Sequence, residues 1–235
     1  ASDVYKRQAL YLTGFRRREL YRSIEQSLIP GPSSLKTLLG RMTHVATQQS
    51  EQICENLSRH GIDLLQGEAS FEEPHVIRVG DRLIETDFVL VATGSHPRRP
   101  DCFEFDDQHV YDSDSLLRLD CIPESLAVIG GGVIGSEYAC VFATLGVEIQ
   151  VIERRPRLLS FLDEEISDHL LQAMRALGIK VHLDNGVERL QRRGDHLELM
   201  LKDGRQFEVD KALVSAGRIG NTAGLGLDKV GVVVN

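Results

Sequence analysis

Two kinds of hydrophobic spacing alternate along the second half of the chain. Short stretches of strand length, each with at least two apolar residues, recur four times, at residues 126–129, 148–152, 180–183 and 212–215. Between them, apolar residues at helical spacing predict helices at 133–145 and 164–177. Alternating runs at 187–192, 196–201 and 206–209 predict antiparallel strands. Strands that alternate with helices indicate an α/β fold with a parallel sheet and right-handed crossovers.

The first half of the chain has a different pattern. Helical spacing predicts helices at 9–28 and from Ser33 or Ser34 to about His60, where Gly61 suits a C-terminal cap. Short strands are expected at 63–66, 76–79 and 83–85. The continuous apolar run at 88–92 is typical of a buried parallel strand, and a sharp loop follows it at 93–97. Residues 98–124 are expected to connect two domains, with a short helix near 114–117.

One turn between a predicted strand and a predicted helix carries a nucleotide-binding pattern. The strand leads into Gly130-Gly131-Gly132-Val133-Ile134-Gly135, which fits GxGxxG. Gly130 permits a tight turn, Gly132 lets the backbone approach a pyrophosphate, and Gly135 lets the helix pack close to the strand. The N–H groups at the start of the helix favour phosphate. These six residues are therefore candidate contacts of a nicotinamide dinucleotide.

An acidic residue ends the next predicted strand. Glu153 lies 18 residues beyond Gly135, where a carboxylate can accept hydrogen bonds from the ribose hydroxyls of NAD. Arg154, Arg155 and Arg157 follow it, and guanidinium groups suit the 2′-phosphate of NADP. The alternatives are a solvated basic loop and, for the whole pattern, a structural glycine turn with a surface glutamate. The preference between NAD and NADP stays open.

Composition excludes several other classes of function. The net charge of −8 argues against a general nucleic-acid-binding protein, and no apolar run is long enough to span a bilayer. The absence of a signal sequence predicts a cytoplasmic protein, and the absence of an initiating Met predicts a fragment or processed product. The eight histidines and four cysteines show no metal-site or redox spacing, so we expect no metal and interpret the cysteines as buried or half-buried thiols.

Ordered motifs along the chain resemble the flavoprotein disulfide reductase family, which includes glutathione reductase and dihydrolipoamide dehydrogenase. They are Gly67-Glu68-Ala69, the run ending in Ala92-Thr93-Gly94-Ser95-His96-Pro97, the segment 130–139, and 216–222. Three further stretches, at 111–115, 157–163 and 217–222, are similar to the soluble, Si-specific pyridine nucleotide transhydrogenases of that family. Dihydrolipoamide dehydrogenase is the alternative branch.

This resemblance implies an FAD-dependent enzyme that moves hydride between NAD(H) and NADP(H). For the nicotinamide dinucleotide it implies contacts from the GxGxxG residues and from Val187 and Gly217. For FAD it implies contacts from Gly67, Ala69, Ala92, Thr93 and Gly94. Glu137 matches a carboxylate that pairs with a lysine near the flavin ring, and a small side chain at Val133 would leave the nicotinamide a path to the flavin.

The resemblance also predicts a Rossmann-like fold with two dinucleotide-binding domains. Residues 1–112 would form a partial FAD domain, and 113–235 the NAD(P) domain, whose last residues lead back toward the first. No GxGxxG precedes residue 92, so we expect a fragment that binds NAD(H), holds FAD poorly, contributes no catalytic side chain and is nearly inactive alone. The parent is expected to be a homo-oligomer whose dimerisation domain is absent. A nucleotide-binding module without catalysis is the remaining alternative.

Overall fold

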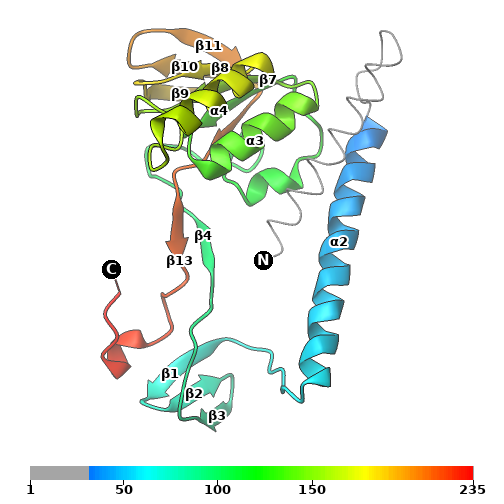
Figure 1. Cartoon of the computed structure of the whole chain (residues 1–235), viewed down its shortest axis with the longest axis vertical. Helices are drawn as coiled ribbons and strands as arrows, with labels where there is room; N and C mark the ends of the chain where they lie inside the picture. Colours follow the sequence, from blue (N-terminus) through cyan, green and yellow to red (C-terminus); the bar gives the residue numbers. More distant parts are fainter. Residues whose placement is uncertain (1–31, 235) are drawn as a thin grey trace. The chain divides into compact units, whose positions relative to one another are not determined.

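Five strands lie parallel in one sheet, as the alternation of strands and helices predicts. In the computed structural model, which describes residues 32–234, their order is β5 (Val110–Tyr111), β12 (Lys211–Val214), β6 (Ser125–Ile129), β7 (Glu148–Ile152) and β8 (Lys180–His182). Strands β7 and β8 of this sheet are labelled in Figure 1. From β6 the chain proceeds outward to β7 and β8, and later returns to β12 on the other side of β6. The sheet therefore has a topological switch point between β6 and β12, where open α/β sheets bind ligands.

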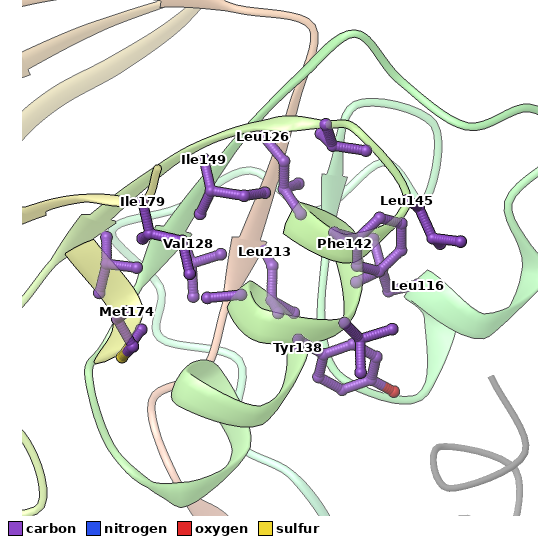
Figure 2. Close-up of a cluster of buried hydrophobic side chains, with 14 of the residues drawn as sticks. Leu116, Leu126, Val128, Tyr138, Phe142, Leu145, Ile149, Met174, Ile179 and Leu213 are labelled. Atoms are coloured by element: carbon purple, nitrogen blue, oxygen red, sulfur yellow. The ribbon is translucent and has the colours of Figure 1, made fainter. Parts of the chain in front are cut away.

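Two helices pack against one face of this sheet. They are α3 (Val133–Thr144) and α4 (Glu164–Ala176), close to the predicted ranges. Tyr138 and Met174 of these helices lie in one buried cluster with Leu126 and Val128 of β6 (Figure 2). Each side chain of this size stabilises the fold by about 1.5–3 kcal/mol when fully buried. The Tyr138 hydroxyl is also satisfied, because it donates a hydrogen bond to the carbonyl oxygen of Ser113 at 2.6 Å.

A small antiparallel sheet covers the opposite face. Its order is β11 (Gln206–Val209), β10 (His196–Leu201) and β9 (Val187–Arg193), which confirms the three predicted strands. Every second residue of β10 is buried, and the inward residues pack with Ala127 of β6 and Ala212 of β12. The result is three layers, in which the parallel sheet is covered on both faces, as such sheets require.

The layers belong to one of two compact units. The larger unit, called the 97–217 unit after its main segment, also includes the described residues 32–47, and it contains β5, which pairs in parallel with β12. The second, discontinuous unit combines residues 48–96 with residues 218–234. The domain boundary between residues 112 and 113 stays a prediction.

The discontinuous unit holds the end of a long helix and short strands. Helix α2 (Pro32–Arg59) has proline as its first residue, a favoured position, and it begins slightly earlier than predicted. Three antiparallel strands follow in the order β1 (Ala69–Glu73), β2 (Val76–Val79) and β3 (Arg82–Glu85). Strand β4 (Ser95–Pro97) pairs with β13 (Arg218–Gly220), and a 3-10 helix, η2, spans Leu227–Val230.

The predicted cap of α2 is confirmed. Gly61 has a φ of 65°, and its N–H donates to the carbonyl of Ser58 while the N–H of Ile62 donates to that of Leu57. These two bonds form a Schellman motif, which satisfies carbonyls that the helix itself leaves open. The predicted helix at 9–28 lies outside the described residues.

Several predictions for the first half are wrong. No strand forms at 63–66, while β1 and β4 were missed. The apolar run at 88–92 is neither a strand nor buried, since Phe88 and Leu90 are each 91% exposed. A central parallel strand needs neighbours at both edges, and the described residues place none beside this run. Three of the four free cysteines, Cys54, Cys102 and Cys121, are exposed rather than buried, because they lie in surface segments.

Candidate dinucleotide-binding site

The glycine-rich turn follows β6 at the switch point. Gly130 has a φ of +111°, which strongly favours glycine, and its N–H donates to the carbonyl of Ile152 at 2.8 Å. A Cβ on Gly130 would lie 2.6 Å from the carbonyl oxygen of Ser215. This position therefore needs glycine both for its backbone conformation and for the neighbouring strand end.

Gly135 is the point at which α3 lies closest to the turn. A Cβ there would overlap the carbonyl oxygen of Gly130 and would lie 2.6 Å from Oγ of Ser215. That hydroxyl donates to the carbonyls of Gly130 at 2.9 Å and Ile129 at 3.1 Å. Sequence reasoning missed Ser215, although its place after β12, beside β6 in the parallel sheet, is a signal that could have identified it.

Gly132 faces open space instead. Its φ of −75° suits any residue, and a Cβ on it would meet no atom within 4 Å. It precedes Val133, which begins α3 and is 56% exposed. The first N–H groups of a helix, here those of Val133, Ile134 and Gly135, have no acceptor within the helix. The turn thus combines free space with backbone donors and a positive dipole end, which fits a pyrophosphate.

Gly131 connects the turn to the acidic residue at the end of β7. The Gly131 N–H donates to Oε2 of Glu153 at 2.6 Å, and the Arg155 N–H donates to Oε1 at 2.9 Å. A Cβ on Gly131 would lie 2.5 Å from Cδ2 of the buried Leu158 and 3.1 Å from Cβ of Glu153. The carboxylate is therefore fixed beside the turn, where an adenosine ribose would lie.

The three arginines that follow Glu153 have different surroundings. Arg157 forms an ion pair with Glu164 at the start of α4, and that contact raises the pKa of its guanidinium. Arg155 donates to Oγ of Ser160 at 3.0 Å. Arg154 is exposed and lies over Gly186 in the loop between β8 and β9.

Other predicted contacts of the nicotinamide dinucleotide lie in the same unit. Glu137 is half-buried in the second turn of α3, and Val187 is half-buried at the start of β9. Gly217 has a φ of +96°, and its carbonyl accepts a hydrogen bond from the N–H of Arg98 at 3.0 Å. Their roles in binding stay predictions.

The residues predicted to contact FAD lie in the discontinuous unit, and all five are exposed: Gly67, Ala69, Ala92, Thr93 and Gly94. Asn221 forms hydrogen bonds with both Thr93 and Gly94. Its N–H donates to the carbonyl of Gly94 at 3.0 Å, its side-chain amide donates to that of Thr93 at 3.0 Å, and the Thr93 hydroxyl donates back to the Asn221 carbonyl at 2.7 Å. Two motifs far apart in sequence are thus adjacent. The described residues contain no second glycine-rich turn of the GxGxxG type.

One stretch that carries the resemblance has a structural role. Oδ1 of the buried Asp112 accepts the N–H groups of Asp114 and Ser115, each at 2.8 Å, at the start of the 3-10 helix η1 (Ser115–Arg118). Its Oδ2 accepts from Nε of Arg99 at 2.6 Å. Burial raises the Asp112 pKa, but the hydrogen bonds from Ser115, Arg99 and Asp114 outweigh it and lower the pKa overall.

Within the described residues, no group of three or more His, Cys, Asp or Glu side chains is arranged to hold a metal ion. None of the helices in that range combines the length and apolar character that a membrane crossing demands.

A family model described as pyridine nucleotide-disulphide oxidoreductase matches residues 12–235. The soluble pyridine nucleotide transhydrogenase of Mycobacterium bovis (strain BCG / Pasteur 1173P2) is 34% identical over 242 residues, which are 99% of this chain and 51% of that protein. The transhydrogenase of the same name from Photobacterium profundum is 38% identical over 205 residues, 85% of this chain and 44% of its own. The chain therefore spans about half the length of the curated relatives it matches.

Solved structures agree with the sequence relatives. LpdA from Mycobacterium tuberculosis has a TM-score of 0.86 and 26% identity, covering 98% of this chain and 52% of that chain. The HOCl-induced flavoprotein disulfide reductase RclA from Escherichia coli has a TM-score of 0.81 and 25% identity, covering 98% of this chain and 50% of that one. The motif resemblance and the fold class are thereby confirmed.

Proposed function

Because this chain belongs to the pyridine nucleotide-disulphide oxidoreductase family, we propose that its glycine-rich turn binds a nicotinamide dinucleotide for hydride transfer between NAD(H) and NADP(H). The observation that carries the proposal is Gly132, which leaves free space at the N-terminus of α3, with the fixed carboxylate of Glu153 nearby. A glycine turn with only a structural role would not need open space at the second glycine of its GxGxxG motif.

Each part of the nucleotide has candidate contacts. The N–H groups of Gly132, Val133 and Ile134 would hold the pyrophosphate, and Glu153 would accept the ribose hydroxyls. Val187 and Gly217 would flank the adenosine and nicotinamide ends. Bound FAD would supply the hydride-carrying chemistry between two nicotinamides. Gly67, Ala69 and residues 92–94 would contribute part of its site, and Glu137 would pair with a lysine near the flavin.

The names of the relatives support the transhydrogenase branch. Two matched proteins are named soluble pyridine nucleotide transhydrogenase, and their matches cover 99% and 85% of this chain. We further propose a cytoplasmic location, a homo-oligomeric whole protein, weak retention of FAD and little turnover by this chain alone.

Binding is tested first, by titrating the chain with NADH and NADPH in a calorimeter. Saturable binding of one nucleotide per chain is expected, with competition by ADP, which shares the adenosine and pyrophosphate. No binding of either nucleotide would overturn the proposal.

Hydride transfer is then tested in the FAD-loaded whole protein, with NADPH as donor and the thionicotinamide analogue of NAD as acceptor. Reduction of the analogue is expected, whereas turnover with dihydrolipoamide alone would point to the other branch.

A further inference from the structure

The edge strand β8 ends in a histidine that contacts both sheets of the 97–217 unit. The His182 ring stacks on Phe207 of β11, with the ring centroids 5.5 Å apart and the ring planes at 18°. Its Nε2 lies 2.8 Å from Oε1 of Gln150, a buried residue of β7. Its Nδ1 lies 2.8 Å from Nη1 of Arg205, in the turn between β10 and β11. One side chain thus joins this turn to the parallel sheet.

The two hydrogen bonds determine which ring nitrogen of His182 carries the proton. A guanidinium can only donate, so Nδ1 must accept from Arg205 and carries no proton. Nε2 then carries the single ring proton and donates to Gln150. A second proton would have to go to Nδ1, where its N–H would face the N–H of Arg205. Protonation therefore removes this contact, whereas the stack on Phe207 tolerates either charge state.

The charged groups that face the ring come from the turn and from the sheet edge. In the turn, Arg205 is paired with Asp203, at 2.7 Å from Nε to Oδ2. At the edge, Lys180 of β8 is paired with Glu148 of β7. Burial, Arg205 and Lys180 lower the pKa of His182, and they outweigh Asp203, which raises it. The surroundings therefore favour the neutral ring that the hydrogen bonds require.

Other charges on the neighbouring elements lie on other faces. Val181 packs into the cluster on the side of α3 and α4, so His182, the next residue of β8, points to the antiparallel sheet instead. Glu208 of β11 is exposed, on the strand face opposite to Phe207. Asp184, two residues beyond the ring, is also exposed. The Arg205 contact is thus the one that a second ring proton opposes most directly.

The same turn is bonded to the segment that holds Glu153. The N–H of Lys202 donates to the carbonyl of Gly186 at 2.9 Å. The Asp203 carboxylate has a hydrogen bond with the side chain of the buried Asn185. The N–H of Asn185 in turn donates to the carbonyl of Glu153 at 3.0 Å. A continuous series of contacts therefore leads from the histidine ring to the carboxylate beside the glycine turn.

We propose that His182 is an acid-sensitive clasp, which holds the β10–β11 turn on the parallel sheet and releases it when the ring takes up a second proton. Release also loosens Glu153, so nucleotide binding weakens in acid; this consequence rests on the proposed function. The Glu153 N–H, which donates to the His182 carbonyl at 2.9 Å, is a second connection. Because the closed clasp disfavours the charged ring, its stabilising effect is complete above the ordinary His pKa of about 6.5 and is lost as pH falls below that value.

Hydrogen exchange at about pH 8 and about pH 5.5, corrected for the intrinsic pH dependence, tests the clasp. The probes are the hydrogen-bonded N–H groups of Lys202, Gly204 and Arg205. Their protection should fall about 5-fold in acid, since one proton taken up one pH unit below a pKa shifts an equilibrium about 10-fold at most. In His182→Gln, which cannot take up this proton, the fall should be lost. His196→Gln is the matched control, because it removes an exposed histidine of β10, and it should behave as the unchanged chain. An equal fall in the unchanged chain and in His182→Gln would overturn the clasp, as would protection that acid leaves unchanged.

NMR of the His182 ring nitrogens keeps the clasp testable if His182→Gln does not fold. At about pH 8 the proton should be on Nε2. Arg205→Gln should raise the pH at which the ring becomes charged, because the cation that faces Nδ1 is removed. A ring protonated at Nδ1 at about pH 8, or a midpoint that Arg205→Gln leaves unchanged, would overturn the clasp.

The link to the nucleotide site is measured by calorimetric titration at the same pH values, with NAD⁺ as the probe because it is stable in acid. The Kd of the unchanged chain should rise about 3-fold more in acid than that of His182→Gln. An equal rise in both chains would overturn the link between the ring and Glu153. A chain that binds no NAD⁺ at either pH would overturn the proposed function, while the exchange and ring measurements still decide the clasp.

Discussion

Replacing Gly135 with alanine should destabilise the 97–217 unit, although Gly→Ala normally stabilises a helix. A Cβ at this position would overlap the carbonyl oxygen of Gly130 and come within 2.6 Å of the Ser215 hydroxyl. Both are parts of closely held strand ends, so neither can move away without breaking its own contacts. Gly132→Ala is the matched control, because its Cβ would meet no atom within 4 Å.

The expected magnitudes follow from these contacts. Alanine gains about 1 kcal/mol over glycine in a helix, while overpacking a close contact costs about 1–3 kcal/mol, and more against backbone. For Gly135→Ala the overpacking cost lies at the upper end of this range, so the net loss in the free energy of unfolding should be about 2 kcal/mol. Gly132→Ala should change it by less than about 1 kcal/mol, the scale of a helix N-cap change. It should raise the Kd for NADH at least about 10-fold, because its methyl group occupies the path of the pyrophosphate.

Urea unfolding monitored by circular dichroism measures the first effect, and calorimetric titration with NADH measures the second. The two variants should separate, one losing stability and the other losing binding. A Gly135→Ala chain as stable as the original would refute the packing argument. A Gly132→Ala chain that binds NADH normally would refute the role of open space at the turn.

Three other perturbations should give distinct results. Glu153→Gln should lower the free energy of unfolding by about 1–3 kcal/mol, since one of two backbone N–H groups loses its acceptor. It should also weaken the binding of NADH more than that of NADPH, and equal weakening of both in calorimetric titrations would count against the ribose role of Glu153. Leu199→Ala removes a fully buried side chain and should lower the free energy of unfolding, measured in urea, by about 2–5 kcal/mol. Met200→Ala, on the other face of β10, should cost less. A larger loss for Met200→Ala would contradict the packing of this face of β10 against the parallel sheet. Burial raises the pKa of Asp106, but hydrogen bonds from the N–H groups of His109, Val110 and Gln108 lower it overall. The stabilising effect of this carboxylate should therefore be complete above the ordinary Asp pKa and be lost as pH falls below that value. The free energy of unfolding of Asp106→Asn should fall less in acid than that of the unchanged chain, and an equal fall in both would exclude this role.

The parallel sheet was predictable because its signals are local. The run 148–152 contains Ile149, Val151 and Ile152, β-branched residues typical of strands, and the structure places β7 at the same residues. Helix α3 begins where the glycine turn requires it, at Val133. The position of Glu153 beside the turn also follows from spacing, because parallel strands end at the same edge of the sheet.

Other features depend on contacts that no local pattern encodes. The run 88–92 has the composition of a buried strand, but burial needs neighbouring strands, and the described residues supply none. Lys202 comes close to Arg154 only through the hydrogen bond between its N–H and Gly186, which joins segments far apart in the sequence. The bonds from Gly131 and Arg155 to Glu153 likewise depend on side-chain orientation, which spacing does not determine.

The proposed function depends most on the binding of a nicotinamide dinucleotide at the glycine turn of the 97–217 unit. Amide chemical shifts of the ¹⁵N-labelled chain, followed during titration with NADH, test this binding most directly. Saturable shifts centred on Gly132, Val133 and Ile134 are expected, with smaller ones at Gly131 and Glu153. Saturable binding whose shifts lie elsewhere, with these amides unmoved, would contradict it.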